Sequence, residues 1–100
     1  DQLRRGSISA ARAVFAQLLD RYPESDLAPQ ALYGVAETWA DEGNGRAADS
    51  VYALVVERYP RSDQAPNALY KRASAARATG QTQQATALYR QIVSQYPRSD

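Results

Sequence analysis

One phrase returns along this chain at a constant spacing of 37 residues, marked by the Tyr-Pro pairs that begin at Tyr22, Tyr59 and Tyr96. RYPESDLAPQALY at residues 21–33 returns as RYPRSDQAPNALY at residues 58–70, and QYPRSD occupies residues 95–100. Periods of about 20–50 residues are typical of stacked supersecondary units, each of which buries its apolar face against the next. The repeat therefore predicts a solenoid.

Within each unit the apolar residues recur at the i, i+3, i+4, i+7 spacing of an amphipathic helix, and two such stripes follow each other. In the unit 27–63 the first stripe predicts a helix over about 27–41 and a second helix follows it. The two stripes consist of Ala28, Ala31, Leu32, Val35, Ala36 and Trp39, and of Ala48, Val51, Tyr52, Val55, Val56 and Tyr59. In the unit 64–100 they consist of Ala65, Ala68, Leu69, Ala73 and Ala76, and of Ala85, Leu88, Tyr89, Ile92, Val93 and Tyr96.

The residues between the stripes predict where helices begin and end. Asp26 is expected to cap the helix that begins near residue 27, with Pro29 in its first turn, where no backbone hydrogen bond is lost. Gly43 is expected to end this helix in a left-handed conformation, and Asn44 to cap the next one. Pro60 cannot continue a helix. The repeated YPxSD phrase is thus the junction between two helical hairpins.

The first unit is interpreted as incomplete. Gly6 aligns with Gly43, so a turn is expected there, with residues 1–5 as the remnant of a preceding helix. The helix after this turn carries Ala11, Val14, Phe15, Leu18, Leu19 and Tyr22. The chain is therefore divided into a partial repeat 1–26 and two repeats, 27–63 and 64–100. Because it does not begin with Met, we expect it to be a segment of a longer protein.

Composition argues against several classes of function. The chain has no Cys and no His, which removes disulfides, thiolate nucleophiles, imidazole bases and Cys/His metal sites. A net charge of +1 without a basic run argues against nucleic-acid binding. No apolar run approaches the roughly 18 residues of a membrane span. No cofactor or metal is expected.

The carboxylates, serines and glycines of the chain also argue against an enzyme. Asp41 and Glu42 are adjacent carboxylates, but an exposed helix end gives them no contrast in environment, which a general acid and base need. The serines have no His to activate them. The GNG at 43–45 is explained by a turn and is too short to cradle a phosphate. We therefore predict no catalytic residues.

The pattern resembles the tetratricopeptide repeat. The first helix of that repeat has Leu, small residues and an aromatic residue at fixed positions, and Gly follows at the turn. The second helix then has small and aromatic residues, and Pro follows it. The unit 27–63 supplies Leu32, Val35, Ala36, Trp39, Gly43, Ala48, Tyr52, Val55 and Pro60. The unit 64–100 supplies Leu69, Ala73, Gly80, Ala85, Tyr89, Ile92 and Pro97, and the first unit supplies Gly6, Ala11, Phe15, Leu18 and Pro23. The resemblance implies an all-α fold: a right-handed solenoid of antiparallel helical hairpins, about two and a half repeats long.

Two positions depart from that pattern. Arg72 stands where Leu is expected, and Ala76 where an aromatic is expected, so the first helix of the last unit should be weakened. The period also exceeds the usual one, with the extra residues in the SDxAP junction. That junction style resembles repeats of bacterial envelope proteins, above all the C-terminal domain of the Tol–Pal-associated YbgF/CpoB family. This narrower resemblance implies a periplasmic or outer-membrane-associated scaffold that takes part in cell division.

In a tetratricopeptide superhelix the first helices line the concave face, which implies a partner-binding surface. Tyr33 and Tyr70 occupy equivalent places there, and Tyr combines flat apolar area with a hydroxyl at low entropy cost. The alternative is that both tyrosines pack between neighbouring helices and show only an edge. The expected partner-binding residues are Gln30, Tyr33, Glu37, Asp41, Asn67, Tyr70, Lys71, Ser74 and Arg77. The Lys/Asn clamp by which some members hold a terminal carboxylate is missing.

The sequence thus predicts a non-catalytic module that binds a protein or peptide partner through its concave face. The alternative is a structural or oligomerisation module of an outer-membrane assembly lipoprotein. The incomplete first repeat would leave apolar side chains such as Phe15 and Leu18 uncovered, because solenoid ends need polar caps. We therefore also expect a homodimer through this end.

Overall fold

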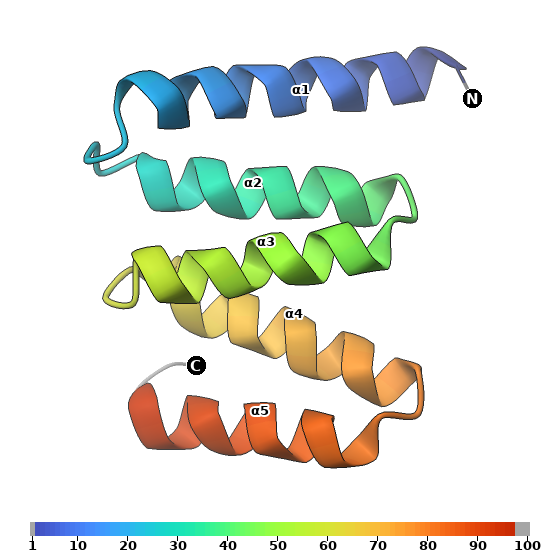
Figure 1. Cartoon of the computed structure of the whole chain (residues 1–100), viewed down its shortest axis with the longest axis vertical. Coiled ribbons are helices and arrows are strands. Elements are labelled where there is room, and N and C mark those ends of the chain that lie inside the picture. The colour runs from blue at the N-terminus through green and yellow to red at the C-terminus, as the bar shows by residue number, and fades with distance from the viewer. Residues whose placement is uncertain (1, 98–100) are drawn as a thin grey trace.

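The computed structural model of this chain describes residues 2–97, which form five α-helices joined by short loops (Figure 1). Residue 1 and residues 98–100, which include the end of the third copy of the repeated phrase, lie outside the described residues. The helices are α1 (Gln2–Arg21), α2 (Ala28–Asp41), α3 (Gly45–Arg58), α4 (Gln64–Ala78) and α5 (Thr82–Gln95). The fold is all-α, as predicted.

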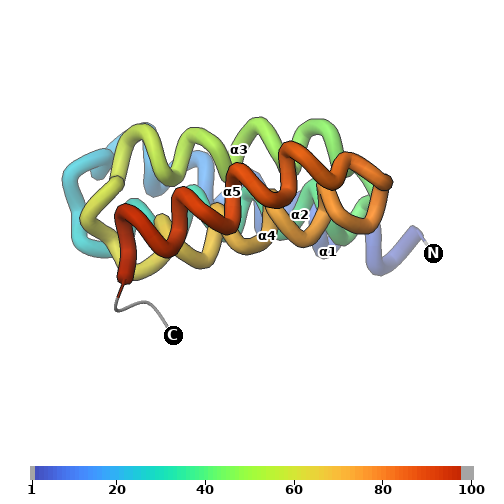
Figure 2. Tube along the Cα trace, turned by 90° about the horizontal axis from the view of Figure 1, so that it is seen from below, coloured from blue at the N-terminus to red at the C-terminus, as the bar shows by residue number. Residues whose placement is uncertain are grey.

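Each helix packs against the next one along the chain, so the helices form a stack of antiparallel hairpins with extents of 37 × 32 × 19 Å. The two YPxSD loops lie at one edge of the stack and the two Gly turns at the other (Figure 1). In addition α2 contacts α4, which places the first helices of successive units side by side. Viewed along the stack, α3 and α4 lie on opposite sides (Figure 2). This is a helical-hairpin solenoid, as the repeat predicted.

The helix ends follow most of the expected local signals. Gly43 and Gly80 have φ angles of 81° and 80°, the left-handed conformation that side chains with a Cβ rarely adopt. The Asn44 side chain accepts a hydrogen bond from the backbone N–H of Ala47 at 3.1 Å, which caps α3.

The prediction that Asp26 caps α2 is wrong. The helix begins one residue later than that cap requires, with Leu27 at the cap position, and no side chain caps it. The Ser25 hydroxyl instead accepts a hydrogen bond from the backbone N–H of Leu27 at 3.1 Å, in the turn before the helix. The Ser of the phrase therefore shapes the turn before α2, as Ser62 does before α4 by donating to the Tyr59 carbonyl oxygen at 2.7 Å.

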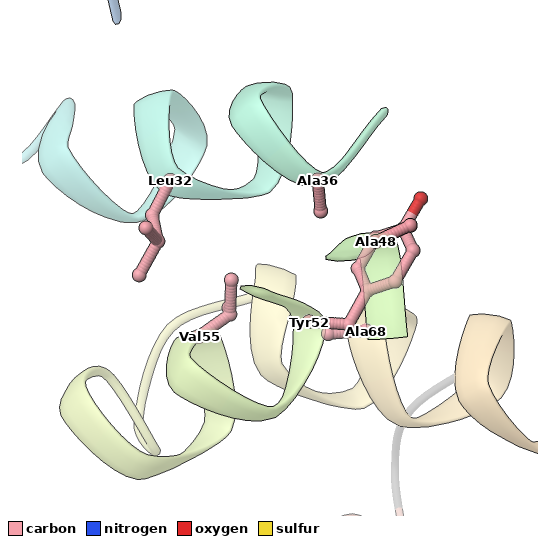
Figure 3. Close-up of a cluster of buried hydrophobic side chains, with 6 residues drawn as sticks. All are labelled: Leu32, Ala36, Ala48, Tyr52, Val55 and Ala68. Carbon is pink, nitrogen blue, oxygen red and sulfur yellow. The ribbon is translucent and has the colours of Figure 1, made fainter. Parts of the chain in front are cut away.

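The core lies between the hairpins and consists largely of small side chains. One cluster joins α2, α3 and α4, and Figure 3 shows Leu32 of α2 and Val55 of α3 pointing toward each other. The remaining members of this cluster are Ala36, Ala48, Tyr52 and Ala68. Ala at these positions lets helix backbones approach closely, while Tyr and Leu fill the remaining space. The predicted core stripes of α2, α3 and α4 are buried or half-buried throughout.

The two end helices differ from the prediction because each has a neighbour on one side only. Val93 of α5 is 71% exposed, and Val14 and Tyr22 at the first unit are each 62% exposed, although all three belong to predicted core stripes. No residue of α1 is fully buried. Phe15 is half-buried, since its ring packs over Gly34 of α2, where an added Cβ would approach it to 2.7 Å.

The prediction of a turn at Gly6 is also wrong. The helix α1 runs without interruption from Gln2 to Arg21, and Gly6 lies inside it. Residues 2–5 therefore extend this helix and do not form the remnant of another one. Gly43 is followed by a second helix that folds back on the first, whereas Gly6 is followed by the continuation of the same helix, α1. The residues 1–26 taken as a partial repeat thus contain a single described helix and the loop after it.

The repeated Tyr-Pro pair forms a hydrogen-bond ladder between units that the sequence analysis missed. The Tyr59 hydroxyl donates to the carbonyl oxygen of Pro23 at 2.9 Å, and the Tyr96 hydroxyl donates to that of Pro60 at 2.7 Å. Each bond joins residues 36 apart, one less than the 37-residue period, because the Tyr of one pair bonds to the Pro of the pair before. The phrase therefore recurs for two reasons: it ends one helix, and it ties its loop to the loop of the unit before.

Candidate partner-binding face

The side chains expected to bind a partner all lie on the two first helices. Gln30, Tyr33, Glu37 and Asp41 belong to α2, and Asn67, Tyr70, Lys71, Ser74 and Arg77 belong to α4. All are exposed except Tyr33 and Ser74, which are half-buried. Because α2 and α4 are in direct contact, the two rows run along neighbouring helices and form a single face, called the α2–α4 face below.

Each of the two expected tyrosines contacts a tyrosine of the second helix in its own hairpin. Tyr33 meets Tyr52 with ring centroids 5.3 Å apart and an interplanar angle of 61°. Tyr70 meets Tyr89 at 6.1 Å and 62°. Edge-to-face geometry of this kind is the arrangement that aromatic quadrupoles favour. The same pair thus repeats in both hairpins, with Tyr33 half-buried and Tyr70 55% exposed.

The first of these pairs lies in an acidic environment. Burial, and after it the charge of Glu37, raises the pKa of Tyr33. Burial raises the pKa of Tyr52 to about 12, with further contributions from Tyr33, Glu37 and Asp41. Both hydroxyls stay protonated at neutral pH and can donate a hydrogen bond. Tyr52 was assigned only to the core, and its place opposite Tyr33 is what the sequence analysis missed.

The second pair lies in a different charge environment. Positions equivalent to Glu37 and Asp41 are held by Ser74 and Ala78, while Lys71 and Arg77 are exposed on the same helix. The α2–α4 face therefore runs from an acidic end at α2 to a basic end at α4. A partner matching this face would carry charges of both signs in the opposite order.

Two contacts between units were not predicted from the sequence, and both involve arginine. Arg12 of α1 lies over the Trp39 ring, with its guanidinium carbon 3.6 Å from the ring centroid, and donates to Glu42 Oε1 at 2.6 Å. One unit further on, Arg72 of α4 donates from Nε to Asp49 Oδ1 of α3 at 2.9 Å. Arg12 and Asp49 stand one period apart and carry opposite charges. This change of charge at an equivalent position was the feature of the sequence that could have indicated these contacts.

A cleft of about 860 Å³ lies at the edge of the stack between the two YPxSD loops. Its walls include Pro23 and Glu24 of the first loop and Arg61 and Asp63 of the second, and Tyr59 spans the gap through its bond to Pro23. The cleft is therefore lined by side chains of both charges. The cleft is continuous with the α2–α4 face through Gln30, which also lines it.

Two further observations concern the described residues. Over residues 2–97 no helix is both long and apolar enough to cross a membrane. Within that same part of the chain no group of three or more metal-ligating side chains is placed to hold a metal ion.

The stacked hairpins, their Gly turns and their small-residue cores define a helical repeat protein. The family model described as tetratricopeptide repeat matches residues 2–25 and 67–99, more than half of the chain, and the chain belongs to this family. Among curated proteins, a search finds none that matches.

Membership of the family sets the general kind of function. Tetratricopeptide repeats form protein–protein interaction modules, and the family is generally non-catalytic. In such a module the fold supplies a rigid surface, and the residues displayed on it determine the partner.

Proposed function

We propose that this chain binds a peptide or a partner protein through the α2–α4 face. The observation that supports this most directly is the repeated aromatic pair. Half-buried Tyr33 and exposed Tyr70 each make an edge-to-face contact with a tyrosine on the second helix of the same hairpin. An aromatic side chain held in one orientation contributes contact area with little loss of entropy on binding, which is typical of binding hot spots. The mixed charge along the face would then set the direction of the bound segment.

The test begins by identifying a partner with the immobilised protein in bacterial envelope extract, followed by a dissociation constant for the purified pair. Tyr70→Ala is the preferred variant, because Tyr70 is more exposed than Tyr33 and its loss spares the core. The binding hypothesis expects weakening by tenfold or more, as hot-spot truncations cost above about 1–2 kcal/mol.

Gln83→Ala is a matched control, since Gln83 is exposed on α5 and lies off the α2–α4 face. Circular dichroism verifies that both variants keep their helices. Equal affinities of wild type, Tyr70→Ala and Tyr33→Ala for the identified partner would refute binding through this face.

For the setting, we propose a bacterial envelope scaffold, periplasmic or associated with the outer membrane, of the Tol–Pal type. The support is the style of the repeated junction, YPxSDxAPxALY, at residues 22–33 and 59–70. Fractionation of the source cells, followed by immunodetection, tests this setting. Recovery with the periplasmic or outer-membrane fraction agrees with it, and recovery with the cytosol contradicts it.

A second candidate function is self-association, as in a structural module of an outer-membrane assembly lipoprotein. The specific observation in its favour is α1, where Leu3 is 85% exposed and Val14 62% exposed on a helix with no fully buried residue. A second copy of the chain packed along α1 would cover both side chains. Light scattering over a concentration series should show a dimer that Leu3→Ser with Val14→Ser converts to a monomer. A monomer at every concentration would exclude this candidate.

A further inference from the structure

The two junctions between successive units can be compared position by position, because they are related by the 37-residue period. At the first junction, between α1 and α2, the half-buried indole of Trp39 packs against the core cluster. The guanidinium of Arg12 covers its ring at 3.6 Å, and Glu42 accepts from that same guanidinium. A ring, a cation and an anion thus form one compact group.

The second junction, between α3 and α4, has the charged members of this group without the ring. Ala76 occupies the position of Trp39, and Thr79 that of Glu42. The cation now comes from α4 as Arg72, and the anion from α3 as Asp49, joined at 2.9 Å. Both charged side chains are held in place by this bond, and among the described residues no cation–π contact involves Arg72.

A cavity of about 340 Å³ is present at this second junction. Its apolar part is formed by Gly45, Ala75 and Ala76, and its polar part by Arg46, Asp49, Arg72, Thr79, Gln81 and Gln84. Several of these residues stand one period after members of the first group, so the cavity corresponds to the space around Trp39. The exposure of Gly45, Ala75 and Thr79 shows that it opens to solvent at the Gly-turn edge.

We propose that this cavity binds an aromatic side chain, Trp or Tyr, of a partner protein, in the place that the Trp39 indole takes one unit earlier. The volume lies at the lower end of the range for ligand sites, about 300–1,000 Å³. The Arg72 guanidinium supplies a flat cation for the ring face, and the Asp49 carboxylate accepts from an indole N–H or a phenol O–H. The alanines leave room for the ring, because no side chain beyond Cβ projects from them.

This site lies at the Gly-turn edge and is separate from the α2–α4 face, so the two proposals succeed or fail independently. It is tested with N-acetyl-tryptophanamide as the probe, followed by amide chemical shifts of the ¹⁵N-labelled protein. We expect saturable shifts centred on Gly45, Thr79 and Gln81, and much smaller shifts with N-acetyl-leucinamide. Arg72→Gln should weaken binding of the probe about 2–5-fold, the range of an exposed cation–π contact.

Ala76→Trp places the missing indole in the cavity from within. This variant should melt at a higher temperature than wild type and should no longer bind the probe. If it does not fold, Ala75→Leu fills part of the same cavity from an exposed position and should also weaken binding. The proposal is overturned if the probe leaves these amides unshifted, if both probes shift them equally, or if the shifts centre on Tyr33 and Tyr70.

Discussion

Tyr52 is the residue at which burial and charge act together most strongly. Its pKa of about 12 lies above the value of about 10 for an unfolded Tyr, so the folded state holds this proton more tightly than the unfolded state does. The resulting stabilisation is fully present below pH 10 and is lost as the pH rises toward 12. The free energy of unfolding is therefore expected to fall as the pH rises from 10 toward 12.

This gives a pH-dependent prediction. Between pH 10 and about 12, wild type should lose more stability in urea titrations than Tyr52→Phe, which has no proton to release at this position. The remaining titratable groups are common to both proteins, so their contributions largely cancel in the comparison. Parallel stability curves over this range would show that Tyr52 does not titrate as the structure implies.

The second prediction at the residue scale concerns Tyr59. Its hydroxyl donates a hydrogen bond to the Pro23 carbonyl oxygen of the preceding unit. Tyr59→Phe keeps the ring and removes this bond, which should cost about 0.5–1.5 kcal/mol in the free energy of unfolding. Tyr22→Phe is the matched control, since Tyr22 has the equivalent position but is 62% exposed. Urea denaturation of both variants checks the prediction, and an equal cost at both positions would contradict the ladder.

At the scale of single helices, the glycines show where sequence reasoning succeeded and where it did not. Gly43 and Gly80 were predicted to end helices, and their positive φ angles confirm it. Gly6 aligned with them but lies inside α1. A glycine permits a left-handed turn without requiring one, and a turn forms only where a following helix can fold back and pack.

The contrast between the glycines is testable by the same substitution at both. Gly6→Ala should raise stability by up to about 1 kcal/mol, since Ala is the better helix former and a Cβ there meets nothing within 4 Å. Gly43→Ala should lower stability by about 1–2 kcal/mol, because its φ of 81° is strained for Ala. Thermal melts compare the two, and a gain at both positions would contradict the assigned turn.

Packing within one hairpin carries a further prediction at this scale. Ala48 is 4% exposed and belongs to the cluster in which α2 meets α3. Ala48→Leu would overpack this contact and should cost about 1–3 kcal/mol. Ala87→Leu on exposed α5 is the control, with no loss expected. Chemical denaturation measures both, and an unchanged midpoint for Ala48→Leu would mean that the register of the hairpin is different.

The periodic stripes predicted the helices because each helix has one apolar side, and that side follows from residue spacing alone. The exposure of Val93 and Val14 could not be predicted this way, since it depends on whether a further helix covers them. The candidate face was placed on two neighbouring helices by the repeat, but its tyrosine pairs join residues 19 apart, Tyr33 with Tyr52 and Tyr70 with Tyr89. Such pairs depend on how the two helices of a hairpin are rotated relative to each other.

At the scale of the whole molecule, the two junctions differ in the charges of their contacting side chains. Arg12 and Asp49 hold the same position one period apart, and each meets its opposite, Glu42 at the first junction and Arg72 at the second. If α3 packed where α1 does, Asp49 would face Glu42. If α1 packed where α3 does, Arg12 would face Arg72. Both exchanges bring like charges together, so a wrong stacking of similar units is disfavoured.

Exchanging the charges of the Asp49–Arg72 pair tests this directly. Asp49→Arg should destabilise the protein more than Asp49→Ala, because it adds repulsion against Arg72 to the loss of a contact. Adding Arg72→Glu to Asp49→Arg should recover most of the loss, since the pair is restored with its charges exchanged. The coupling should be about 0.2–1 kcal/mol, the range for partly exposed pairs, and should shrink in high salt. Urea denaturation of the three variants and wild type gives the coupling. If the double variant is no more stable than Asp49→Arg alone, charge does not contribute to the packing of this junction.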